Sequence, residues 1–310
     1  MSLVWMIVFG LLAAVLIGGG GLVGTIMMYA RKRRRAKFDP REDLGLKHVD
    51  AEDQAFFKEL LSRAPANGAV APGDANVAWA KGQRLLEAYQ GDHASLKLAG
   101  QAFGEALSHD PQFAPAWAGL AEACLLACYS HSDGFGDVYW RGGLAQSERL
   151  ADRALELSPG DNDAIAIKAS YRRLRGYVSE AEQLLDKGDP AWWHIAQVRA
   201  GCHSDHERYE DQLKELRVAT ENAPQGRKAK LLNAFGSALS HMYRFQPAID
   251  AFDSALQLEP SYAWAWHNRA LALMRLGKKQ DALASSNKAL QLGDFAAARD
   301  LNERLRRVVK

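Results

Sequence analysis

Apolar residues recur along most of the chain at the spacing of one helical face, and residues 230–260 show this best. The first segment of this stretch carries apolar or small residues at i, i+3, i+4 and i+7, namely Leu232, Phe235, Gly236 and Leu239. The second segment carries them at i, i+4 and i+7, namely Ala248, Phe252 and Ala255. Two antiparallel helices cross closely only where Gly or Ala removes side-chain bulk. The stretch therefore predicts a tight helical hairpin that ends at Pro260.

This hairpin pattern repeats along the chain. A second hairpin follows at an offset of 34 residues, with Trp266, Ala270 and Leu273 in its first helix and Ala282, Ser286 and Ala289 in its second. Prolines close helical segments at spacings of 48, 31, 34 and 36 residues, at Pro111, Pro159, Pro190, Pro224 and Pro260. Three of these spacings lie near 34, the period of the tetratricopeptide repeat. The longer spacing indicates an insertion in the second hairpin.

With this period and these small and aromatic positions, the chain resembles the tetratricopeptide repeat family over about residues 78–294, most specifically in 98–127 and 229–292. The resemblance implies an all-α fold, a right-handed α-solenoid of tetratricopeptide-type helical hairpins over residues 77–294. Six hairpins are expected, at about 78–110, 114–158, 162–189, 191–223, 227–259 and 263–293. Residues 295–310 predict a last helix with a charged side that caps the array, through Arg299, Glu303, Arg306 and Arg307.

The N-terminus has the pattern of a membrane anchor. Residues 3–30 contain no charged side chain, whereas about 20 apolar residues suffice for a helix to span a bilayer. Trp5 and Tyr29 stand near its two ends, where amphipathic aromatics prefer to lie. A cleaved secretory signal would carry its basic residues before the apolar stretch, but here they follow it. We therefore expect one transmembrane helix within residues 1–30.

The basic residues after the anchor indicate orientation. They are Arg31, Lys32, Arg33, Arg34, Arg35 and Lys37. The positive-inside bias places everything from Arg31 onward in the cytoplasm, so we expect a single-pass protein of the cell membrane. The same side chains would attract anionic lipid headgroups. Residues 31–76 further predict a short helix from Asp50 and a linker rich in Gly, Pro and Asn.

Small residues form one stripe of the expected anchor helix, at Gly10, Ala14, Gly18, Gly21 and Thr25. Such a stripe lets two membrane helices approach closely, which favours a transmembrane helix partner. The alternative is that glycine is simply common in membrane helices.

The net charge and the motifs of the sequence limit the classes of function that we expect. Beyond the first 37 residues the chain has 33 basic and 37 acidic side chains, a net charge of −4, which argues against nucleic-acid binding. We find no nucleotide-binding glycine loop, zinc-protease helix or hydrolase serine elbow, and we expect neither enzymatic activity nor a cofactor. The three cysteines form no disulfide framework. The run Cys202–His206 holds metal-binding residue types, but adjacent ligands rarely reach one metal, and we interpret it as a polar turn.

We therefore expect a membrane-anchored scaffold or assembly factor that binds partner proteins, as a helix or an extended peptide in the groove of the solenoid. By the register of the family, the residues that would face a partner are His194, Gln197, Lys230, Asn233, Ser237, Trp264, His267, Asn268 and Leu271. A second candidate surface is the insertion, with Phe135, Tyr139, Trp140 and Arg141.

Three alternatives stay open. Trp264 could instead pack against the preceding hairpin, and the insertion aromatics could fold back and extend the second helix. The alternative function is a regulatory or sensing module that binds a small ligand or a metal at the Cys202–His206 turn.

Overall fold

The computed structural model describes residues 72–309, apart from 90–92, 131–140 and 294. Within this part the chain forms thirteen α-helices and no strand. They are α4 (Pro72–Ala88), α5 (His93–His109), α6 (Ala114–Ser130), α7 (Arg141–Leu157), α8 (Asn162–Leu174), α9 (Val178–Leu185), α10 (Trp193–Asp205), α11 (Tyr209–Asn222), α12 (Gln225–His241), α13 (Phe245–Leu258), α14 (Ala263–Arg275), α15 (Lys279–Leu292) and α16 (Ala296–Val309).

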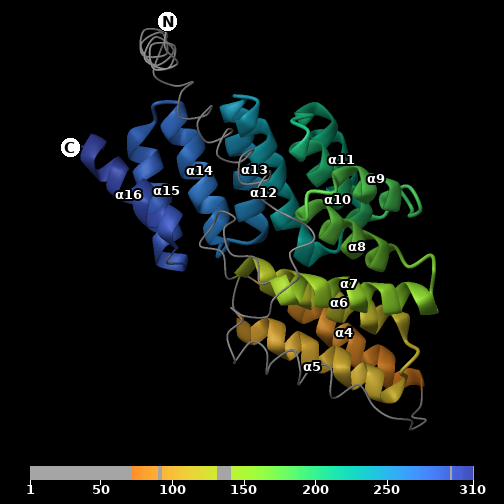
Figure 1. Cartoon of the computed structure of the whole chain (residues 1–310). Coiled ribbons are helices and arrows are strands. Elements are labelled where there is room, and N and C mark those ends of the chain that lie inside the picture. The colour runs from red at the N-terminus through yellow and green to blue at the C-terminus, as the bar shows by residue number, and fades with distance from the viewer. Residues whose placement is uncertain (1–71, 90–92, 131–140, 294, 310) are drawn as a thin grey trace, which may run out of the picture. The chain divides into compact units, whose positions relative to one another are not determined.

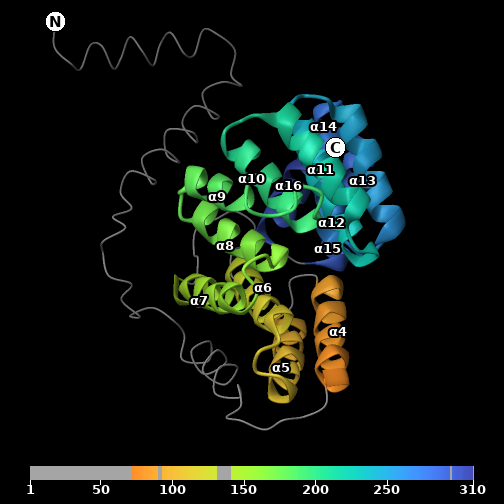
Figure 2. The same ribbon diagram turned by 90° about the vertical axis from the view of Figure 1, so that its right-hand side faces the viewer.

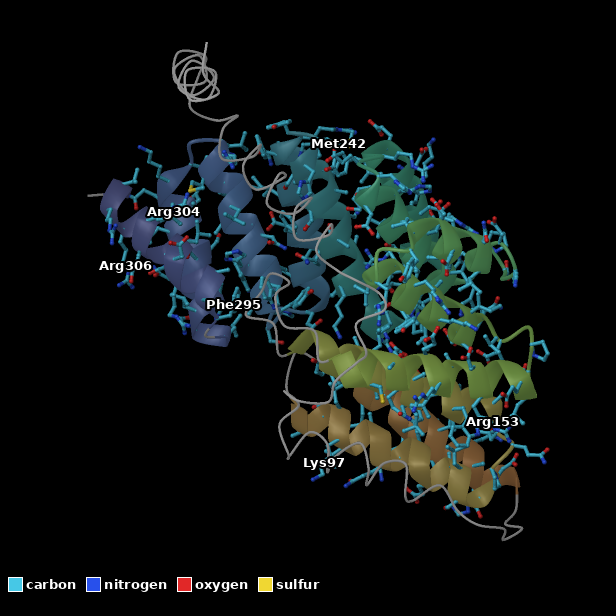
Figure 3. All side chains as sticks on the ribbon, in the orientation of Figure 1. Lys97, Arg153, Met242, Phe295, Arg304 and Arg306 are labelled. Carbon is cyan, nitrogen blue, oxygen red and sulfur yellow. The ribbon has the colours of Figure 1, made fainter. Side chains whose placement is uncertain are left out.

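Consecutive helices pair as hairpins that stack along the chain (Figure 1). The pairs in the described residues are α4–α5, α6–α7, α8–α9, α10–α11, α12–α13 and α14–α15, with α16 packed on α15. The prediction of an all-α solenoid of helical hairpins is confirmed. Helix α16 covers the last hairpin with Ala298, Leu301 and Leu305, which are buried. Arg304 and Arg306 project from its other side (Figure 3).

Glycines set the close approach of neighbouring helices, both within a hairpin and between two hairpins. A Cβ at Gly119 of α6 would lie 2.5 Å from the ring of Phe103, which α5 contributes to the core. In the fifth hairpin a Cβ at Gly236 would lie 2.6 Å from the ring of Phe252. Both rings are almost completely buried. The small residues therefore recur in the sequence because each leaves room for an aromatic ring of a neighbouring helix.

Each of the last four hairpin turns contains one residue with a left-handed backbone. These residues are Gly176 (φ 86°), Glu207 (φ 57°), Tyr243 (φ 60°) and Gly277 (φ 76°). Glycine takes this conformation without steric cost, whereas a bulky side chain does so only with strain. Tyr243 therefore stands out among the four turns.

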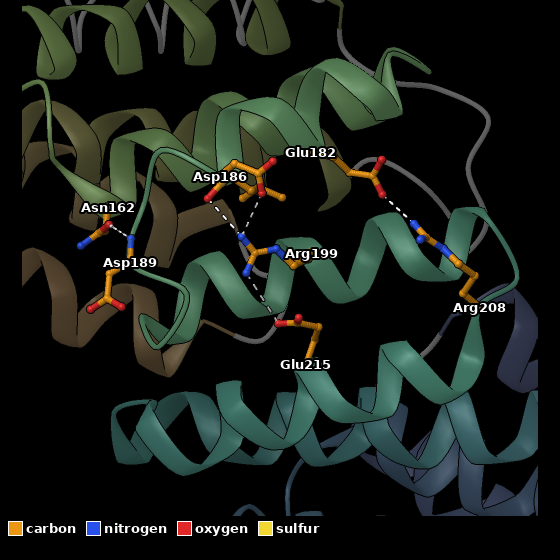
Figure 4. A network of polar contacts seen from close by, with 8 residues as sticks. Asn162, Glu182, Asp186, Asp189, Arg199, Arg208 and Glu215 are labelled. Carbon is orange, nitrogen blue, oxygen red and sulfur yellow. Dashed lines mark hydrogen bonds and ion pairs between the residues drawn. The ribbon is translucent and has the colours of Figure 1, made fainter.

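Polar contacts join the third and fourth hairpins, where the repeat pattern in the sequence is weakest. Arg199 of α10 donates to the carbonyl of Leu185 (3.1 Å), and its guanidinium lies 3.7 Å from Asp186 and 4.0 Å from Glu215 (Figure 4). The side-chain oxygen of Asn162 accepts from the backbone N–H of Asp189 at 2.8 Å. These contacts hold α8, α9, α10 and α11 together.

None of the helices described between residues 72 and 309 has the length and apolar character that a bilayer crossing requires. The stretch 1–30, where the anchor is predicted, lies outside the described residues, as do Arg31, Lys32, Arg33, Arg34, Arg35 and Lys37. The anchor and its lipid contacts therefore stay predictions.

Candidate partner-binding surface

The first helices of the hairpins lie side by side, with direct contacts between α4 and α6, α6 and α8, α8 and α10, and α12 and α14. Helix α4 also contacts α12, so the first hairpin meets the fifth. Figure 2 shows one end of α4 directly below α12. This meeting decides which part of the inner surface is open to a partner.

Lys230 of α12 is the centre of the contact with α4. Its ammonium group donates to the backbone carbonyls of Glu87, in the last turn of α4, and of Tyr89, just after α4, at 3.1 Å from Glu87. A cation at the carbonyl end of a helix also interacts favourably with the helix dipole. Burial, together with the neighbouring Arg227, lowers the pKa of Lys230 to about 8. One turn earlier, Gly226 lies so close to Glu87 that an added Cβ would come within 2.7 Å of it.

Arg227 makes a second long-range contact from the same face of α12. Its guanidinium lies 2.8 Å from the carboxylate of Glu122 on α6, and the two side chains are only 9% and 8% exposed. The guanidinium also lies 5.3 Å from the ring centroid of Trp193. We call Arg227 and Lys230, with Glu122, Glu87 and Tyr89, the α12 clasp.

His194 belongs to a neighbouring polar cluster on α8 and α10. Its Nδ1 lies 3.1 Å from the carboxylate of Asp163, which also accepts from the indole N–H of Trp192 at 3.0 Å. Burial raises the pKa of Asp163, but the hydrogen bonds of His194 and Trp192 outweigh it and hold that pKa below its usual value. His194 is therefore buried in an internal contact, while Gln197, three residues on, is exposed.

The fifth and sixth hairpins place three predicted residues together. The side-chain amide of Asn268 donates to the side-chain oxygen of Asn233 at 2.9 Å and lies 3.5 Å from the hydroxyl of Ser237. That hydroxyl donates to the backbone carbonyl of Asn233 at 3.0 Å. All three are half-buried, as is Leu271 beside them on α14. We call Asn233, Ser237 and Asn268 the amide row.

Trp264 and His267 pack against the segment that leads into α16. The rings of Trp264 and Phe295 stack with centroids 4.1 Å apart, and His267 lies edge-on to both. His267 is 3% exposed, and burial lowers its pKa to about 4. The sequence pattern did not single out Phe295, because it lies between two helices rather than within a repeat position.

The insertion is described only at its end. Phe135, Tyr139 and Trp140 lie outside the described residues, and Arg141 begins α7. Their role as a second binding surface stays a prediction.

The prediction of a polar turn at Cys202–His206 is wrong, because α10 runs to Asp205 and only His206 follows it. The segment does not assemble a ligand set. Cys202 is completely buried, and burial raises the pKa of its thiol to about 11. Asp205 forms an ion pair with Arg173 at 3.1 Å, and His206 lies 3.9 Å from Glu182. Throughout the part of the chain that the structure describes, no group of three His, Cys, Asp or Glu side chains could hold a metal ion.

Comparison with solved structures confirms the class of fold. The chain is similar to PilF of Pseudomonas aeruginosa (20% identity, TM-score 0.53, covering 64% of this chain and 85% of PilF). It is also similar to a chain of the APC/C hetero-tetramer Cut9–Hcn1 (16% identity, TM-score 0.55, covering 81% of this chain and 52% of that chain). A third similar structure is the human IFIT1 dimer with PPP-AAAA (17% identity, TM-score 0.58, covering 73% of this chain and 52% of that chain). The chain spans only about half the length of the last two.

These likenesses show the fold alone: the chain is a solenoid of the tetratricopeptide repeat type. Neither the protein-family models nor the curated proteins gave a match.

Proposed function

We propose that the protein is a membrane-anchored scaffold that binds a partner protein on the inner surface of its fifth and sixth hairpins. The observation that carries this proposal is the amide row. Its amide and hydroxyl groups both donate and accept hydrogen bonds, as the backbone of an extended peptide requires. Leu271 offers an apolar contact next to them.

The α12 clasp supports this narrower location. Lys230 and Arg227 are committed to the carbonyls of α4 and to Glu122, so they are not available to a partner as long as the clasp is closed. His194 is likewise committed to Asp163. Of the residues that the family register places on the inner surface, the half-buried amide row and Leu271 and the exposed Gln197 are therefore the best placed to contact a peptide.

A cross-linking experiment tests the binding surface. A photoreactive amino acid at Leu271 of the detergent-solubilised full chain should capture a partner that the same amino acid at the exposed Lys97 of α5 does not. Asn233→Ala with Asn268→Ala should abolish the capture at 271, because the peptide backbone loses its hydrogen-bond partners. Because half-buried residues are changed, the melting temperature of the double variant is measured alongside. A stable double variant that still captures the partner would exclude this surface.

The anchoring half of the proposal comes from the sequence. The uncharged stretch 3–30 and the six basic residues after it support a single-pass protein of the cell membrane with the solenoid in the cytoplasm. The chain should stay in the membrane fraction after carbonate and high-salt washing. Release by salt alone would mean that electrostatics hold it, since salt screens such contacts.

A further inference from the structure

Tyr243 combines two unfavourable features at one position. Its backbone is left-handed (φ 60°), a conformation that glycine supplies at two of the equivalent turns, at Gly176 and Gly277, and that Glu207 adopts at the third. Its side chain is 80% exposed, so the ring gains little from burial. Strained residues persist where the surrounding structure or a function requires them, and they cluster at binding sites. An exposed aromatic residue held in this way therefore suggests a binding role.

The next hairpin turn lies beside Tyr243. The Lys278 ammonium donates to the side-chain oxygen of Gln246 at 3.3 Å, which joins the α14–α15 turn to the α12–α13 turn. Leu276 of the second turn is 40% exposed. Phe245 packs edge-on against Tyr243, with centroids 6.0 Å apart, and so supports the ring from the helix side. Figure 3 places Met242, the residue before Tyr243, at the upper edge of the solenoid.

We call residues 241–246 and 275–281 the turn edge. It carries four exposed cations, Arg244, Arg275, Lys278 and Lys279, against a single carboxylate, Asp281. Arg244 lies 3.9 Å from Glu210, at the limit of an ion pair. The other three cations have no carboxylate within ion-pair distance among the residues that the structure describes. The turn edge therefore presents uncompensated positive charge around an exposed aromatic ring.

We propose that the turn edge binds the surface of an anionic lipid bilayer. Tyr243 and Leu276 would lie at the level of the headgroups, where amphipathic and apolar side chains are favoured at a membrane interface. Arg244, Arg275, Lys278 and Lys279 would contact lipid phosphates. The solenoid would then contact the membrane directly, in addition to the predicted anchor.

A bilayer is favoured over an acidic protein because of proximity, and this step rests on the proposed anchoring. About 40 residues separate Arg31 from Pro72, a length that reaches at most roughly 140 Å. A tethered solenoid meets the lipid surface at high effective concentration, so even a weak two-turn contact forms.

Hydrogen exchange in lipid nanodiscs tests the proposal. The full chain is reconstituted in phosphatidylcholine discs with and without phosphatidylserine. Amide exchange at 241–246 and 275–281 should be slower in the discs that contain phosphatidylserine, and high salt should remove the difference. If the chain fails to enter either kind of disc, the anchoring proposal fails. The turn edge is then tested by cosedimentation with vesicles of the same two compositions.

Two variants separate lipid binding from folding. Tyr243→Gly removes the ring and the backbone strain together, so thermal stability should rise while the phosphatidylserine-dependent protection falls. Lys278→Glu with Lys279→Glu should abolish that protection. The matched controls are Val77→Ser and Lys97→Glu, which remove an exposed apolar side chain and an exposed cation elsewhere. Both controls should keep the protection.

Three outcomes would overturn the proposal. The first is equal exchange in both kinds of disc. The second is protection that survives Lys278→Glu with Lys279→Glu. The third is protection by added polyglutamate but not by phosphatidylserine, which would assign the turn edge to an acidic protein partner instead.

Discussion

The α12 clasp should make Arg227 one of the most sensitive polar residues of the chain. Arg227→Met keeps a long apolar side chain over Trp193 but leaves the carboxylate of Glu122 in a site where its side chain is 8% exposed. Removing one partner of a buried ion pair costs about 3–5 kcal/mol, because the remaining charge is desolvated without compensation. The loss of the cation–π contact adds roughly 0.5–2 kcal/mol.

A matched pair on the surface gives the control. Arg153 and Glu156 are also 2.8 Å apart, but their side chains are 46% and 65% exposed (Figure 3 labels Arg153). Water solvates both charges there, so Arg153→Met should change stability by no more than about 0.5 kcal/mol. The two substitutions remove the same kind of contact at the same distance and differ in burial.

Urea unfolding of the detergent-solubilised full chain, followed by circular dichroism, measures both losses. Adding Glu122→Gln to Arg227→Met should recover part of the stability, because no buried charge then remains. A loss in Arg227→Met no larger than in Arg153→Met would refute the argument from burial. Failure of Glu122→Gln to recover any stability would show that the carboxylate is not the source of the cost.

Three further predictions concern single residues. Gly119→Ala should destabilise the protein by about 1–3 kcal/mol in the same assay, because its Cβ would meet the ring of Phe103 at 2.5 Å. Gly104→Ala, which has open space around its Cβ, should instead stabilise α5 by about 0.5–1 kcal/mol. Equal effects of the two substitutions would contradict the close crossing. Burial lowers the pKa of His267 from 6.5 to about 4, so its contribution to stability is complete above pH 6.5 and falls by up to roughly 3 kcal/mol as the pH drops from 6.5 to 4. His267→Gln should remove that part of the pH dependence of stability. Identical dependence of stability on acid pH in the two proteins would contradict this assignment to His267. Cys202 should resist alkylation in the native protein and react after unfolding, as mass mapping would show, because its buried thiol has a pKa of about 11. Rapid native labelling would mean that the C-terminal end of α10 opens.

Some features of the structure could be predicted from the sequence and others could not. Gly236 and Phe252 predicted a close crossing, and the structure places an added Cβ at Gly236 2.6 Å from that ring. Such positions can be predicted from the sequence because both residues lie in one hairpin and their spacing follows the helical period. The left-handed backbone at Tyr243 could not be predicted from the sequence, because this conformation is expected at a glycine and no glycine stands at that turn.

The binding surface depends on contacts between distant segments. The family register placed Lys230 on an open groove, but its ammonium lies on the carbonyls of Glu87 and Tyr89, more than 140 residues away in the chain. Trp264 likewise meets Phe295, which belongs to no repeat position. A periodic pattern reports which face of a helix is inward, and it contains no information about which distant helix meets that face.

The sequence by itself therefore determined the local units: helical hairpins of about 34 residues, their close crossings and the charged helix after the last of them. These follow from contacts within a few dozen residues, where helix period and side-chain volume decide the outcome. Only the tertiary structure decided that α12 closes on α4 and α6, because the buried pair of Arg227 and Glu122 forms only when the two hairpins between them, α8–α9 and α10–α11, have stacked. That closure, rather than the repeat pattern, commits Lys230 and Arg227 to internal contacts and singles out the amide row as the candidate binding surface.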